Sequence, residues 1–138
     1  MNMKRGGGWV VAQLVLFLLI FVSWFLGPGV TRLGWLVALI GVVIAGAAIR
    51  AMGGSLTAFP RPRPDGELVV DGPYSMMRHP IYVGGVFFFA GLSLVFSAWG
   101  LVLTAVLALF WVAKSRREER HLMERFEGYA EYRRRTWF

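Results

Sequence analysis

An arginine–histidine pair stands directly before an apolar run that has the character of a membrane span. Arg78 and His79 lie in residues 72–84, which read GPYSMMRHPIYVG. Charged and titratable side chains are costly at membrane depth, so those found there usually serve chemistry or ligand binding. Tyr74 and Tyr82 place two hydroxyl groups near the pair, and a pair of glycines then leaves room for a ligand beside the backbone. This set predicts a site for a flat heterocycle, a carboxylate and a cation.

A second polar cluster follows the last apolar run. Residues 116–121 read RREERH and include the acidic pair Glu118 and Glu119. The pair begins about one helical turn beyond the apolar run, so antiparallel packing of two helices would bring it to the level of His79. A buried carboxylate there would bind an amino group, a ribose hydroxyl or a sulfonium.

The third cluster is the tail, whose residues 129–135 read YAEYRRR. Arginine suits bidentate binding of a carboxylate or phosphate, so a tail that folds back over the loop would close a pocket. The spacing leaves open which of Arg133, Arg134 and Arg135 reaches it. The tail has helical spacing, with Gly128 as the point where it kinks or ends. The residues on its shared face are Leu122, Phe126, Tyr129 and either Tyr132 or Arg133.

Each cluster also has an explanation without chemistry. Arg78 would extend to lipid headgroups, and His79 would cap the helix that starts at the following proline. The two glutamates would pair with nearby arginines on a solvated helix face. The tail would anchor the chain at the membrane interface through its aromatic rings and basic residues.

Apolar blocks predict the elements that position these clusters. Hydrophobic residues make up 57% of the 138 residues, and they occur in blocks close to the length that crosses a hydrocarbon core of about 30 Å. We therefore predict an all-α integral membrane protein, one domain over residues 1–138. The first block follows two basic residues, as in a signal peptide, but its length and the lack of a cleavage site favour a retained span. The predicted spans are residues 9–26, 33–49, 81–97 and 99–113.

The distribution of basic residues predicts the orientation. The net charge is +7, and with four spans all lysines and arginines except Arg32 fall on one side. By the positive-inside rule, both termini and the loop over residues 50–80 are cytoplasmic. The basic excess then reflects topology and attraction to anionic lipid rather than nucleic-acid binding. We expect a multi-pass protein of a bacterial or archaeal inner membrane.

Residues 50–80 and 114–138 should form a cytoplasmic cap over the spans. Prolines at positions 60, 62, 64 and 73 exclude a continuous helix through the loop. A loop of this length in so small a protein is more often functional than idle. The chain has no cysteine, which excludes disulfides and thiolate chemistry, and its two histidines lack the companions of a metal site.

Taken in order, these motifs resemble the isoprenylcysteine carboxyl methyltransferase family of integral membrane enzymes and the related phospholipid N-methyltransferases. The resemblance covers roughly residues 60–135. The motifs that carry it are Gly72-Pro73-Tyr74, Arg78-His79-Pro80, Tyr82-Val83-Gly84, Glu118-Glu119 with Leu122, and Phe126, Tyr129 and Tyr132 followed by arginines.

The resemblance implies that S-adenosylmethionine is the cofactor and that its methyl group passes to a lipophilic acceptor, a carboxylate, amine or thiol. Arg78 and Arg135 would orient the acceptor, and Glu118 is the third catalytic candidate. An amine or thiol acceptor must lose a proton, which Glu118 or His79 would take. The expected substrate is a lipophilic small molecule or a lipid, and the protein is expected to be surrounded by membrane lipid. The sequence does not indicate an oligomeric state. The residues expected to line the cofactor pocket are Tyr74, His79, Pro80, Tyr82, Gly84, Glu119, Leu122, Tyr129 and Tyr132.

Two other functions stay open at this point. Sterol reductases of similar membrane architecture also carry an Arg-His-Pro loop and an acidic tail motif, and they use NADPH. The paired glutamates and the short chain favour the methyltransferase. The second alternative is a small membrane scaffold or lipid-binding protein without catalysis, in which the polar clusters would tolerate alanine.

Overall fold

The computed structural model describes residues 6–57 and 59–138, and its regular structure there is helical, which confirms the predicted all-α class. Lys4 and Arg5, which contribute to the predicted charge asymmetry, lie outside the described residues. The elements in chain order are α1 (Gly7–Ser23), α2 (Gly34–Met52), the short 3-10 helices η2 (Gly53–Ser55) and η3 (Gly72–Ser75), α3 (Pro80–Phe96), α4 (Ala98–Arg125) and α5 (Tyr129–Arg135).

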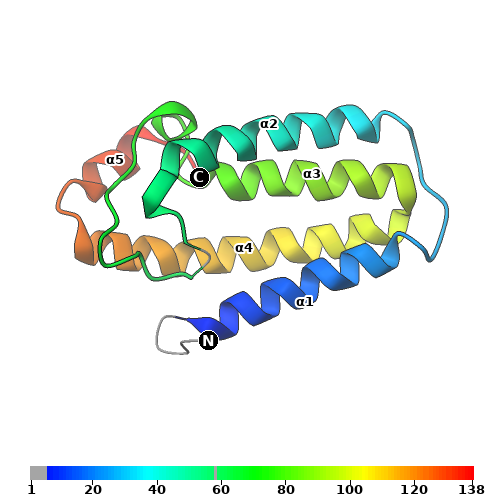
Figure 1. The fold of residues 1–138 in the computed structure, drawn as a ribbon, viewed down its shortest axis with the longest axis horizontal. Helices are drawn as coiled ribbons and strands as arrows, with labels where there is room; N and C mark the ends of the chain where they lie inside the picture. Colours follow the sequence, from blue (N-terminus) through cyan, green and yellow to red (C-terminus); the bar gives the residue numbers. More distant parts are fainter. Residues whose placement is uncertain (1–5, 58) are drawn as a thin grey trace.

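The four long helices run side by side, and their order in space differs from their order in the chain (Figure 1). Helix α2 packs along α3, α3 packs on α4, and α1 lies against α4 on the side away from α2. A core of Ile20, Leu107 and Trp111 joins α1 to α4. The chain passes from α3 to α4 through the extended residue Ser97, whose hydroxyl caps α4 by accepting a hydrogen bond from the amide of Trp99.

Two helices in the described part of the chain, α2 and α4, are long and apolar enough to cross a membrane. Helices α1 and α3 are apolar but have 17 residues each, a length of about 25 Å at 1.5 Å per residue. The four-span topology therefore stays a prediction. Large apolar side chains project outward from α1, α2 and α4, as expected of a surface that meets lipid.

Helix α4 extends well beyond its apolar part. It has 28 residues, of which the segment after residue 113 is rich in charge and leaves the predicted span. The predicted tail helix is thus divided: its first part continues α4, and Phe126, with extended backbone, ends it. After Gly128 the chain forms α5, which folds back beside the start of α3 (Figure 1).

Glycines let α2 and α3 approach closely. A Cβ added at Gly41 would lie 2.4 Å from the carbonyl oxygen of Gly84, and one added at Gly91 would lie 2.2 Å from the amide nitrogen of Ala38. Both distances fall far below van der Waals contact, so a side chain at either position would push the helices apart. Small residues at a helix interface allow this close packing within a membrane.

Replacement of Gly41 by alanine should therefore destabilise the protein. We expect a loss of about 1–3 kcal/mol, the usual result of overpacking a tight interface, and a lower melting temperature in detergent. Gly46 provides the matched control, because it lies on the same helix with open space at its Cβ position. Gly46→Ala should melt at or above the wild-type temperature; equal melting of the two variants would contradict the packing argument.

Candidate functional site

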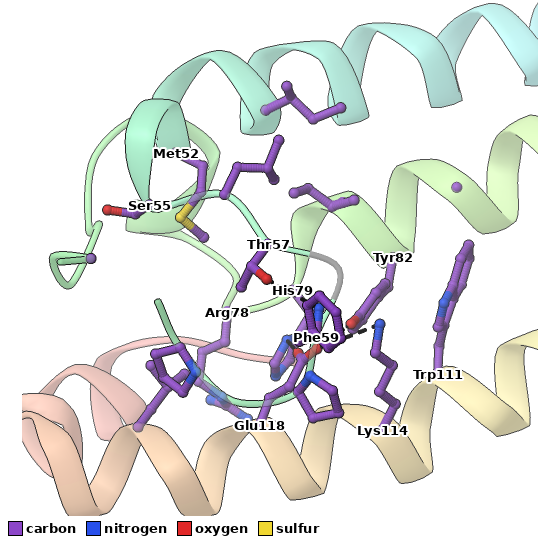
Figure 2. A pocket seen from close by; sticks show the side chains of 18 of the residues that line it. Met52, Ser55, Thr57, Phe59, Arg78, His79, Tyr82, Trp111, Lys114 and Glu118 are labelled. Carbon is purple, nitrogen blue, oxygen red and sulfur yellow. Dashed lines mark hydrogen bonds and ion pairs between the residues drawn. The ribbon is translucent and has the colours of Figure 1, made fainter. Parts of the chain in front are cut away.

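A cavity of about 490 Å³ lies among the four long helices and the segment from residue 55 to 67 (Figure 2). Its volume falls in the usual range of small-molecule sites, roughly 300–1,000 Å³. One end is polar and is lined by Arg78, His79, Glu118 and Lys114. The remainder is lined mainly by apolar side chains of the helices, including Phe17, Ile49, Phe89 and Trp111. The cavity thus joins a charged end to an apolar arm.

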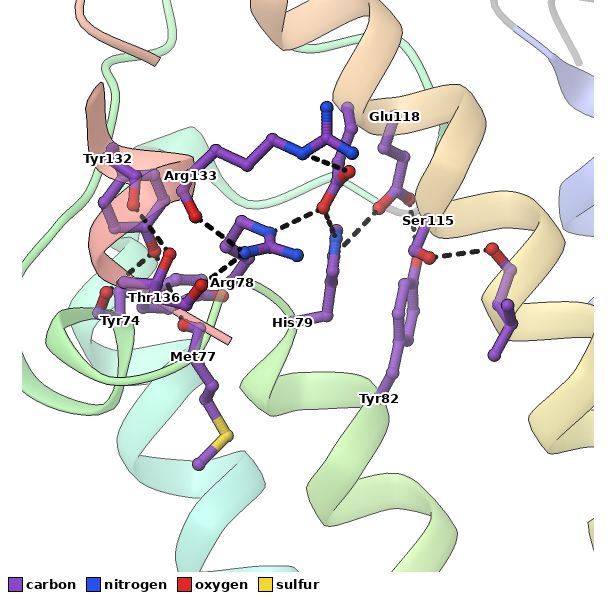
Figure 3. A network of polar contacts seen from close by, with 12 residues as sticks. Tyr74, Met77, Arg78, His79, Tyr82, Ser115, Glu118, Tyr132, Arg133 and Thr136 are labelled. Atoms are coloured by element: carbon purple, nitrogen blue, oxygen red, sulfur yellow. Dashed lines mark hydrogen bonds and ion pairs between the residues drawn. The ribbon is translucent and has the colours of Figure 1, made fainter. Parts of the chain in front are cut away.

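The start of α3 positions the Arg-His pair. Pro80 occupies the first turn of the helix, where its missing N–H leaves no hydrogen bond unmade, and His79 is the N-cap residue. His79 is buried and lies between two carboxylates of α4 (Figure 3). Its Nε2 is 3.1 Å from Oε1 of Glu119, and its Nδ1 is 3.7 Å from Oε2 of Glu118. The predicted antiparallel juxtaposition of His79 with the acidic pair is therefore present.

Glu119 is the centre of an ion-pair cluster. Nε of Arg78 donates to its Oε1 over 2.7 Å, and Nε of Arg133 lies 3.6 Å from its Oε2. Burial acts to raise the pKa of Glu119, but the hydrogen bonds from His79 and Arg78 outweigh it and lower the pKa to about 2. Glu119 is therefore ionised at neutral pH.

Glu118 faces a different set of neighbours, since successive residues on a helix point about 100° apart. Its Oε1 accepts a hydrogen bond from the Tyr82 hydroxyl, and Nζ of Lys114 lies 3.9 Å from the same oxygen. Burial raises the pKa of Glu118, while the positive charge of Lys114 opposes the rise. The pKa values of two adjacent carboxyl groups are thus shifted in opposite directions, a pattern that often separates acid and base roles.

The tail packs against the residues that carry the polar end of the cavity. The hydroxyl of Tyr132 donates to the carbonyl oxygen of Tyr74 over 2.7 Å, and burial raises the pKa of Tyr132 to about 12. Nη1 of Arg78 donates to the carbonyl oxygens of Thr136 at 2.6 Å and Arg133 at 3.1 Å. Arg78 therefore connects α5 to the start of α3, as Figure 3 shows. The same side chain also binds Glu119 of α4. These contacts hold the tail against the loop, although none of residues 129–138 lines the cavity.

The structure divides the predicted site residues into those that line the cavity and those that do not. Four that do not line it are Pro80, Glu119, Tyr129 and Tyr132. The predicted residues that line the cavity itself are Tyr74, Arg78, His79, Tyr82, Glu118 and Leu122.

Two predicted residues have other positions. Gly84 faces α2, where an added Cβ would lie 2.6 Å from the amide nitrogen of Ala45, so it is a packing residue; its neighbour Gly85 lines the cavity instead. Arg135 is exposed, and the tail arginine near Glu119 is Arg133. Both differences arise because neighbouring residues on a helix face different directions, and only packing decides which direction meets the site.

Sequence reasoning missed several polar and aromatic residues of the cavity, among them Trp111, Lys114 and Gln13. Trp111 and Lys114 share one stripe of α4 with Glu118 and Leu122 at helical spacing, and this spacing was available as a signal. Gln13 is a polar residue within an apolar helix, and it reaches the same cavity from α1. In residues 6–57 and 59–138, no group of three or more metal-ligating side chains would hold a metal ion.

Two curated proteins are similar to part of the chain. One is the cobalt-zinc-cadmium resistance protein CzcN of Cupriavidus metallidurans, 42% identical over 78 residues, or 54% of this chain and 35% of that protein. The other is the nickel-cobalt-cadmium resistance protein NccN of Alcaligenes xylosoxydans xylosoxydans, 39% identical over 72 residues, or 51% of this chain and 34% of that protein. The chain thus matches about a third of the length of each relative.

The family comparison covers more of the chain. The model of the phospholipid methyltransferase family matches residues 30–128. The matched segment contains α2, α3 and α4 with the loop between them, and with them the Arg-His pair and both glutamates of the cavity. This chain belongs to the phospholipid methyltransferase family.

Proposed function

We propose that this protein is a membrane methyltransferase that uses S-adenosylmethionine and modifies a lipophilic acceptor. Family membership supports methyl transfer at a membrane. The observation that carries the finer proposal is the single cavity that joins a cluster of charged side chains to an apolar arm between helices. A charged, water-soluble donor suits the first part, and an acyl or prenyl chain suits the second.

The polar end has the donor set that this cofactor requires. The molecule carries a carboxylate, an ammonium group, ribose hydroxyls and a sulfonium; cationic side chains of the site suit the first and carboxylates suit the others.

The residues we assign to cofactor binding are those around His79 and Glu119, with Tyr82 and Leu122 on the cavity wall. Glycine at position 85 contributes space: an added Cβ there would lie 2.6 Å from the indole ring of Trp111. We therefore propose that the ligand approaches the backbone of α3 at Gly85 rather than at Gly84.

When bound, S-adenosylmethionine supplies a methyl group already activated by a sulfonium. The protein mainly has to align the acceptor and exclude water, which contributes on the order of 7–11 kcal/mol in well-oriented reactions. Arg78 lines the cavity and is suited to orient an anionic group of the acceptor. Glu118 is suited to take the proton that an amine or thiol acceptor releases, because His79 is already engaged by Glu119. A carboxylate acceptor would need only the arginine.

The proposed topology follows the same division. With four spans and both termini in the cytoplasm, the donor enters beside the 55–67 segment and the acceptor enters from the bilayer along the apolar arm. Arg133 takes the place in the tail that was expected of Arg135, because it is the arginine near Glu119.

Calorimetry of the detergent-purified protein tests the cofactor. We expect S-adenosylmethionine and S-adenosylhomocysteine to bind with affinities on the order of micromolar, near −8 kcal/mol. Glu119→Ala and His79→Ala should abolish binding, because each leaves a buried partner uncompensated. Glu124→Ala, an exposed change on the same helix, is the control and should bind normally. Binding of NADPH alone would favour a reductase, and binding of none of the three would favour a non-catalytic protein.

Glu118→Gln tests the proton acceptor while keeping the shape of the side chain. We expect transfer of labelled methyl from S-adenosylmethionine to a bacterial membrane lipid extract to fall about 10²-fold or more. Binding of S-adenosylhomocysteine should persist, and Glu124→Gln should transfer at the wild-type rate. Wild-type transfer by Glu118→Gln would remove Glu118 from the mechanism.

A further inference from the structure

A buried lysine lies at the junction between the polar end of the cavity and its apolar arm. Lys114 lines the cavity on α4, one turn before Glu118, and its side chain is 1% exposed. Removing an ammonium group from water costs several kcal/mol unless charge and hydrogen bonds compensate it. The presence of a buried lysine at position 114 therefore has to be explained, and the function proposed above assigns this residue no role.

Helix α1 supplies one contact to this lysine. Oε1 of Gln13 accepts a hydrogen bond from Nζ of Lys114 over 3.1 Å and another from Nε1 of Trp111 over 2.8 Å. Lysine and tryptophan side chains only donate hydrogen bonds, so the amide oxygen must be the atom that faces both. Gln13 thus fixes two residues of the α4 stripe at once. The family match begins at residue 30, so this contact comes from outside the matched segment.

Both contacts of Gln13 lead to the same oxygen of Glu118. Through Lys114, the ammonium group lies 3.9 Å from Oε1 of Glu118. Through Trp111, the indole ring stacks on Tyr82 with centroids 5.0 Å apart, and the Tyr82 hydroxyl donates to that same Oε1. Nζ of Lys114 also lies 5.4 Å from the centre of the Tyr82 ring, which adds a cation–π contact. In Figure 2, Lys114, Tyr82 and Glu118 converge on one side of the cavity.

We propose that Lys114 is a positioning residue that keeps Glu118 ionised and aimed at the cavity, and that Gln13 of α1 holds Lys114 in place for this purpose. The role in catalysis rests on the proposed function, but the electrostatic relation between the two residues does not. The proposed role of Gln13 makes α1 part of the site, whereas the segment matched by the family contains only α2, α3 and α4 among the long helices.

The groups that face Glu118 determine the direction of the effect. From α3 these are His79 and the hydroxyl of Tyr82, and from η3 the hydroxyl of Tyr74. From α4 they are Lys114, which favours the ionised carboxylate, and Glu119, which opposes it. Without Lys114, burial and the negative charge of Glu119 meet less opposition, so Glu118 should take up its proton at a higher pH.

Infrared difference spectroscopy across a pH titration measures this protonation directly and needs no acceptor. The carboxylic-acid C=O band that disappears in Glu118→Gln belongs to Glu118. Its midpoint should rise by about one pH unit or more in Lys114→Met, the usual effect of an opposite charge at this range, and Lys114→Arg should return it toward the wild-type value. Arg116→Met, which removes an exposed charge from the same helix, should leave it unchanged.

Gln13→Leu gives a second measurement that keeps the lysine and removes its anchor. A smaller shift in the same direction supports the proposal, and unchanged midpoints in both Lys114→Met and Gln13→Leu overturn it. Calorimetry with S-adenosylhomocysteine on the same samples separates the two hypotheses. Absence of binding by the wild-type protein would defeat the methyltransferase proposal, whereas the comparison of midpoints would still decide the role of Lys114.

Discussion

The buried carboxylate of Glu119 is the interaction on which the arrangement of the site depends. A charge removed from water must be paired, and Glu119 has partners in two segments: Arg78 and His79 directly before α3, and Arg133 in α5. Satisfying it therefore requires that α5 fold back and that the 72–79 segment meet α4. Arg78 strengthens the same closure by donating to carbonyl oxygens at the end of α5.

Glu118, one residue earlier, has the complementary position. Its neighbours are a tyrosine hydroxyl, a buried lysine and the far side of the histidine ring, and it lines the cavity that Glu119 only borders. One carboxylate thus stabilises the fold of the site and the other remains available to a ligand. The division follows from helix geometry, since adjacent side chains on α4 turn toward different elements.

The cavity connects these charged side chains to the apolar side chains of the long helices. Tight glycine packing of α2 on α3 forms one side, and α1 on α4 forms the other, so the apolar arm lies between helix pairs rather than inside one pair. The cavity thus has a charged part and an apolar part. In the phospholipid methyltransferase family this is consistent with chemistry performed where a membrane meets water.

Features that depend on local order could be predicted from the sequence. Pro80 marks the start of α3, so Arg78 and His79 lie directly before its first turn. Glu118 and Glu119 follow the apolar run of α4 within the same helix. Both placements can be read from a single helix. Only the tertiary structure decided that Gly85 rather than Gly84 faces the cavity, that Arg133 rather than Arg135 reaches Glu119, and that Gln13 reaches Lys114 from α1. These outcomes depend on which face of each helix meets a neighbour distant in the chain. Local periodicity does not contain that information, because it is set by the packing of the whole bundle.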